Sequence, residues 1–152
     1  MELNKKYHIP LVLSCVLLLY AFWFIFRPVK IIAVHQHGSR FSSVLVNHFP
    51  LTDRGKINWW LENRTMLKEK YHVPATDKKS YFSVIFWLFG EGYKERGKYD
   101  LLCFDDMKSE KRCIEKDAVF IVSHTGDDRT YFTMDGARYL LKSNGEWVTE
   151  RS

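Results

Sequence analysis

The chain has few of the residues that divide a protein into pieces or build common enzyme sites. Its 152 residues include only four prolines, eight glycines and three cysteines. The prolines and glycines are scattered along the chain, which excludes a long low-complexity linker. The sequence also lacks a P-loop, a dinucleotide-binding glycine fingerprint, a Gly-x-Ser-x-Gly elbow and a His-Glu-x-x-His motif. These absences favour one folded domain that carries no recognisable catalytic motif.

A strong excess of one charge is missing beyond residue 30. The net charge of +5 includes a balance of +3 from residues 1–30, where four basic residues face the single acidic residue Glu2. Residues 31–152 carry 19 basic and 17 acidic side chains. The basic character therefore arises partly beside the first apolar segment, and nucleic-acid binding is not supported.

What is present first is a long apolar run. The segment from Ile9 to Phe26 contains no charged residue over 18 positions. As a helix it covers about 27 Å, close to the hydrocarbon thickness of a bilayer. The run ends in bulky aromatic residues and Arg27, whereas a signal-peptidase site needs small residues. We therefore expect a short leader at residues 1–8 and an uncleaved transmembrane helix at residues 9–26 that contacts the lipid bilayer.

The short leader and the cysteines bear on orientation. A short segment before the apolar run is typical of a signal anchor with a cytoplasmic N-terminus, which places residues 31–152 on the exported side of the membrane, the periplasm in the case of a bacterium. Cys103 and Cys113 form an even pair at hairpin spacing, so an oxidising compartment predicts a disulfide between them. The alternative is a pair of buried free thiols in a cytoplasmic domain.

One amphipathic helix is expected after Leu51-Thr52-Asp53, where Thr52 or Asp53 can cap its first turn. Its apolar residues recur at helical spacing, interrupted by Arg64, and its charged residues Lys56, Glu62, Lys68 and Glu69 lie largely off this stripe. Pro74 ends the pattern.

Strands are expected on both sides of this helix. Alternation and turn signals predict them at Ile31–Gln36, Phe41–His48, Tyr81–Phe89, Tyr99–Phe104, Cys113–Lys116, Ala118–His124, Arg129–Asp135, Ala137–Lys142 and Glu146–Glu150. Tyr81–Phe89 is heavily apolar, which is typical of a central strand covered on both faces. The fold class is α+β: a single transmembrane helix, then a mostly antiparallel sheet with one main helix against a face.

Candidate chemistry is sparse. His35 and His37 share one face of a strand, which provides half of a metal site, but their sequence surroundings add no further ligand motif. The carboxylate pairs Asp105-Asp106 and Asp127-Asp128 lie in expected hairpin turns, where Asp commonly forms local hydrogen bonds. We predict no catalytic residue, no metal and no cofactor.

Several stretches of the chain, taken in order, form a pattern: Arg27–His35, Val44–Thr52, Gly55–Leu61, Gly92–Lys94, Tyr99–Asp106 and Cys113–Lys116. This pattern resembles a family of enterobacterial membrane proteins with a domain of unknown function. The resemblance implies a single-pass envelope protein of enteric bacteria. By analogy it suggests the small accessory proteins encoded near interbacterial toxin systems such as type VI secretion, most of which would be immunity proteins.

Three function classes follow. The first is an inner-membrane immunity protein that binds and blocks a toxin, such as a phospholipase. The second is a structural or regulatory subunit of an envelope complex. The third, an envelope enzyme, is disfavoured because no nucleophile or metal constellation is recognisable.

Two loops are candidates for partner binding. The loop at Glu91–Arg96 offers Glu91 and Tyr93, and the loop at Asp105–Lys111 offers the acidic residues Asp105, Asp106 and Glu110. We expect the two loops at opposite ends of the strand Tyr99–Phe104, so that only one can face the partner. The second is favoured because a disulfide at its base would pre-organise it.

Overall fold

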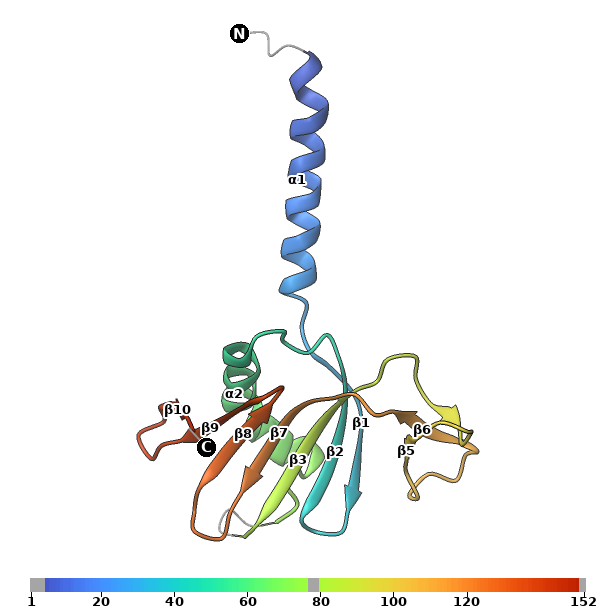
Figure 1. Cartoon of the computed structure of the whole chain (residues 1–152), viewed down its shortest axis with the longest axis vertical. Helices are drawn as coiled ribbons and strands as arrows, with labels where there is room; N and C mark the ends of the chain where they lie inside the picture. The colour runs from blue at the N-terminus through green and yellow to red at the C-terminus, as the bar shows by residue number, and fades with distance from the viewer. Residues whose placement is uncertain (1–4, 77–79, 151–152) are drawn as a thin grey trace.

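The computed structural model describes residues 5–76 and 80–150. An isolated helix, α1 (Lys5–Ile25), projects from one end of a domain built from sheets and a second helix (Figure 1). No residue of α1 is buried, and the helix is long and apolar enough to cross a membrane. The helix begins at Lys5, four positions before the predicted span, because residues 5–8 of the polar leader are also helical.

The end of α1 carries an aromatic and cationic cluster. The Arg27 guanidinium lies 4.3 Å from the ring centroid of Phe24 and 5.3 Å from that of Trp23. Aromatic rings with a basic neighbour are typical of the boundary between lipid and water. Val29, only four residues after α1, already packs against the core of the domain. The domain therefore follows the helix without a long linker.

The main sheet has seven strands in the order β1-β2-β3-β7-β8-β9-β10. Only β2 and β3 are parallel, and α2 (Asp53–Tyr71) is the crossover that joins them. The mostly antiparallel sheet with one main helix confirms the predicted fold class. The strands span β1 (Lys30–His37), β2 (Phe41–Asn47), β3 (Phe82–Leu88), β7 (Ala118–His124), β8 (Thr130–Met134), β9 (Ala137–Leu141) and β10 (Trp147–Thr149).

The helix α2 covers one face of this sheet. The Thr52 side chain accepts a hydrogen bond from the Gly55 backbone at 3.0 Å and caps the helix, as predicted. Ile57, Trp60 and Leu67 are buried in the core against the sheet. The prediction for Lys56 was wrong: the residue is only 8% exposed, and its Nζ donates to the Val119 carbonyl at 3.1 Å. A backbone acceptor at the sheet satisfies the buried ammonium.

The helix ends at Tyr71, and its capping residue His72 lies two residues before Pro74. His72 adopts a left-handed conformation with φ 55°, and its N–H bonds the Lys68 carbonyl at 3.2 Å. The following Val73 N–H reaches the Leu67 carbonyl at 3.1 Å. Such paired bonds satisfy the last carbonyls of a helix and stop it.

A separate three-stranded sheet, here called the small sheet, has the order β4-β6-β5. Its strands are β4 (Lys94–Glu95), β5 (Leu101–Cys103) and β6 (Lys111–Glu115). Phe104 and Ile114 of this region are fully buried with Leu45 of the main sheet, and Trp87 packs against them. Because Val84 and Phe86 face α2 while Trp87 faces the small sheet, β3 has apolar contacts on both faces.

The sequence predicted no strand at Lys94–Glu95, which it treated as a polar connection. Lys94 pairs with Cys113 in the register of β4 and β6, and its ammonium bonds Glu115 at 2.8 Å. These contacts come from β6, which lies far along the sequence, so local alternation could not indicate them.

Candidate functional site

The disulfide between Cys103 and Cys113 fixes the base of the second candidate loop. Cys103 on β5 lies directly opposite Cys113 on β6, with their Cα atoms 4.0 Å apart. The bond confirms the predicted pairing. It closes the chain around residues 104–112, so the two ends of the turn cannot separate while the bond is intact.

His35 on β1 lies beneath this loop. The side chain is nearly buried, and its ring stacks on the Phe104 ring with centroids 3.9 Å apart and planes inclined by 13°. His37, on the same face of β1, lies at 6.1 Å from Phe104. The two histidines therefore share a face, as predicted, but that face meets an aromatic ring. Among the described residues, no three His, Cys, Asp or Glu side chains converge as a metal site.

The two ring nitrogens of His35 contact both candidate loops. Nδ1 lies 2.8 and 2.9 Å from the two carboxylate oxygens of Asp106, and Nε2 lies 2.8 Å from the Tyr93 hydroxyl. Because a carboxylate only accepts, Nδ1 is the donor to Asp106, and in the neutral ring Nε2 accepts from Tyr93. Burial raises the pKa of Tyr93, and the nearby negative charge of Asp106 raises it further.

This contact corrects the expectation that the two loops lie apart. They were predicted at opposite ends of one strand, with only one able to face a partner. In the structure, β4 and β5 flank β6, so that Lys94 and Cys103 both pair with Cys113. One residue from each loop, Tyr93 and Asp106, then reaches His35. Because β4 pairs with β6, the two loops lie side by side and form one continuous surface.

The other predicted site residues are exposed. Within the described part of the chain, the side chains of Asp105 and Glu110 make no hydrogen bond or ion pair. Glu91 pairs with the Lys94 ammonium at 2.8 Å. The pKa of Lys94 is raised to about 12, chiefly by its hydrogen bond to Glu115 and next by its hydrogen bond to Glu91. Glu91 thus belongs to a surface ion-pair network, whereas Asp105 and Glu110 remain available.

A hollow of about 360 Å³ lies beside this loop, and we call its lining residues the charged tip. They carry three basic and two acidic side chains: Glu95, Arg96, Lys108, Ser109, Glu110 and Arg112. Of these residues, the sequence pattern indicated only Glu110. It missed Arg96, Lys108 and Arg112 because the pairing of β4 with β6, which brings Glu95 opposite Lys111, is not visible in a local pattern.

Comparison with known proteins gives one match. No curated protein and no solved structure matches the chain. A family model matches residues 2–151, nearly the whole sequence. The chain therefore belongs to the family described as "Enterobacterial putative membrane protein (DUF943)".

Proposed function

We propose that this chain is an inner-membrane immunity protein. In this proposal α1 spans the membrane, the leader stays in the cytoplasm, and the domain from residue 31 lies in the periplasm. There the domain acts by binding a toxin that enters from a competing bacterium, and it performs no chemistry itself. A toxin that attacks lipids, such as a phospholipase, would meet the anchored domain beside its own substrate.

The orientation is supported by the disulfide and by α1. Disulfides persist in the periplasm and are rare in the cytoplasm, where thiols are kept reduced. The bond between Cys103 and Cys113 therefore favours an exported domain. The helix α1 is long and apolar enough to cross a membrane, and it would anchor an exported domain there.

The proposal that the domain binds a toxin rests on the loop Asp105–Lys111, which lies beside the charged tip. The disulfide fixes its base and the Asp106–His35 hydrogen bonds fix its beginning, while Asp105 and Glu110 stay exposed. A loop that is already ordered loses little conformational entropy when it binds. Charged side chains on such a loop steer a partner of complementary charge and set its orientation. Asp105 and Glu110 suit a basic rim around a toxin active site.

A second candidate is a subunit of an envelope complex, favoured by the edge of the main sheet. The strand β10 (Trp147–Thr149) pairs with β9 on one side only and presents exposed residues, including Val148. An open edge can accept a strand from another chain.

Protection against a toxin tests the immunity proposal. Any product of a gene beside the gene for this chain that kills an enteric host when directed to the periplasm is tested with and without the full-length chain. We expect survival only when the chain is present, and toxin that co-purifies with it. Death despite normal amounts of the chain would overturn the immunity role.

Charge reversal tests the surface. The double variant Asp105→Lys and Glu110→Lys should bind toxin at least about tenfold more weakly, because like charges then face each other. The control variant Glu62→Lys reverses the charge of one exposed acidic residue on α2, and it should protect the host as well as the wild type does. If all variants are folded and protect equally, the loop Asp105–Lys111 is not the interface.

A further inference from the structure

A second hollow lies at the end of the domain that faces away from α1. It measures about 540 Å³, within the range of sites for small ligands. Trp60 of α2, Phe82 of β3 and Leu141 of β9 line its apolar part. Phe82 pairs with His124, and in Figure 1 the turn between β7 and β8 lies at the far end of the sheet from α1. The hollow therefore opens on the membrane-distal side.

His124 brings an unsatisfied polar atom into this hollow. The residue is only 6% exposed, and its ring stacks on Phe82 with centroids 5.3 Å apart. Nδ1 lies 3.0 Å from the Thr130 hydroxyl, which can donate to it and leave Nε2 as an N–H donor. Nε2 has no hydrogen-bond partner among the described residues. Its nearest acceptor is the Asp128 carboxylate at 3.5 Å, beyond the usual length of an N–H···O hydrogen bond, so a ligand oxygen would give this buried donor a closer partner.

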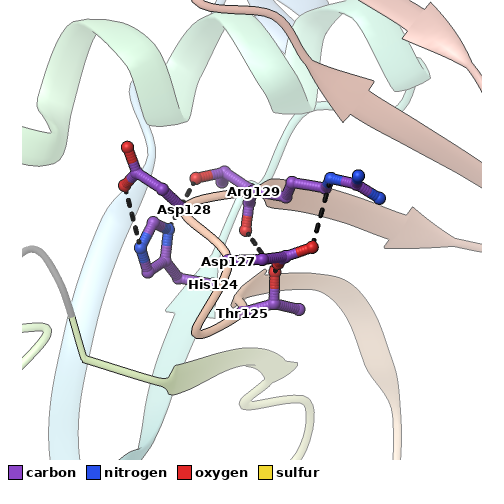
Figure 2. Close-up of polar contacts among 6 residues, drawn as sticks. His124, Thr125, Asp127, Asp128 and Arg129 are labelled. Carbon is purple, nitrogen blue, oxygen red and sulfur yellow. Dashed lines mark hydrogen bonds and ion pairs between the residues drawn. The ribbon is translucent and has the colours of Figure 1, made fainter.

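A rigid turn holds an acidic side chain beside this ring. Figure 2 shows the Asp128 carboxylate facing the ring of His124, and its Oδ1 lies 3.5 Å from Nε2. Asp128 adopts a left-handed backbone with φ 64°. The turn is closed by Asp128 N–H to Thr125 O at 3.1 Å and Thr125 N–H to Arg129 O at 2.9 Å. The hydroxyl of Thr125 bonds Asp127, and Arg129 Nε lies 3.2 Å from the same carboxylate.

The opposite wall comes from the second half of α2. Lys68 Nζ donates to the carbonyls of Pro74 and Thr76, at 2.6 and 2.9 Å, and so ties the segment after the helix to its last turns. The side chains of Arg64 and Glu69 are exposed and make no hydrogen bond or ion pair within the described residues. Arg64 is the residue that interrupts the apolar stripe of α2. Its guanidinium is thus available at the wall of the hollow.

We propose that this hollow binds a short peptide that has free termini and apolar side chains. The wall carries two basic and two acidic side chains around an apolar floor, which matches a ligand with both charges and no net charge. The peptide carboxylate pairs with Arg64. The ammonium group pairs with Asp128 or Glu69, and a side chain packs on Trp60 and Phe82. His124 Nε2 donates to a peptide oxygen. This proposal is independent of the immunity role.

Binding of dileucine to the full-length chain in detergent micelles tests the proposal. Dileucine has both termini and no aromatic ring, so calorimetry and tryptophan fluorescence can both follow its binding. We expect saturable binding at one site. N-acetyl-dileucine and dileucine amide, which each lack one terminal charge, should bind at least about tenfold more weakly. No saturable binding, or equal binding of the three compounds, would overturn the proposal.

Variants assign each charge. Arg64→Gln should remove the preference for the free carboxylate, and Asp128→Asn with Glu69→Gln should remove the preference for the free ammonium. Glu62→Gln, on α2 but outside the hollow, should leave all three affinities unchanged. Thermal melting establishes that each variant is folded. If folded Arg64→Gln still preferred dileucine over dileucine amide, the result would contradict the site. A long peptide that ends in Leu-Leu has no free ammonium group near its carboxylate, so an affinity equal to that of dileucine would also contradict the proposal.

Discussion

His35 Nδ1 lies 2.8 Å from the Asp106 carboxylate, although 71 positions separate the two residues in the sequence. The contact joins β1, the first strand after α1, to the loop between β5 and β6. With the disulfide at its base, the loop is held at two points. Its exposed charges therefore keep a defined position relative to the main sheet.

Removing the His35 ring should destabilise the domain. His35→Ala leaves a cavity beside Phe104 and leaves the Tyr93 hydroxyl and Asp106 without this partner. We expect the free energy of unfolding to fall by about 2–4 kcal/mol. Urea denaturation followed by tryptophan fluorescence measures it. His37→Ala, on the same strand face but exposed, should change stability by less than about 0.5 kcal/mol. Equal effects of the two variants would show that His35 does not secure the small sheet.

The disulfide should be present in the protein isolated from the envelope. Thiol labelling of the denatured, unreduced chain should modify Cys15 and leave Cys103 and Cys113 unmodified. Cys113→Ser should lower the free energy of unfolding by about 2–4 kcal/mol, because the unfolded chain loses its cross-link. Cys15→Ser, in the exposed helix α1, serves as the control and should unfold like the wild type. Labelling of all three cysteines in the wild type would remove the bridge.

Tyr93 should ionise at a higher pH than an ordinary tyrosine, since burial and the Asp106 charge both raise its pKa. The folded chain then holds this proton more tightly than the unfolded chain. The resulting stabilisation is complete below about pH 10 and is lost as the pH rises through the raised pKa. Ultraviolet absorbance of tyrosinate, compared with Tyr93→Phe, identifies the titration.

Asp106→Asn separates the two causes of this shift. It should lower the pKa of Tyr93 only partly, because burial is the larger cause. A Tyr93 that titrates at the ordinary value in the wild type would contradict its placement beside His35.

The sequence predicted the elements whose signals are local. The uncharged run at Ile9–Phe26 indicated α1, and the spacing of Ile57, Trp60 and Leu67 indicated α2. The Cys103–Cys113 pairing was also predictable, because hairpin spacing brings two short strands together. In each case the residues that make the pattern are also the residues that make the contacts.

The long-range parts of the site could not be predicted in this way. The strand β4 has two residues, too few for any periodicity, and it exists through its pairing with β6. Without β4, the loops appeared to lie apart, and the link from His35 to Tyr93 and Asp106 was invisible. From the sequence, His35 could be considered only as half of a metal site, because spacing reveals a shared strand face but not what packs on it.

The side of the membrane on which the domain lies is the central claim, since the disulfide and the binding of a periplasmic toxin both depend on it. Reporter fusions after Ser152 test it most directly. The account predicts an active alkaline phosphatase fusion, which needs the periplasm, and a silent fusion to a reporter that works only in the cytoplasm. The reverse pattern would contradict the periplasmic domain and the immunity role with it.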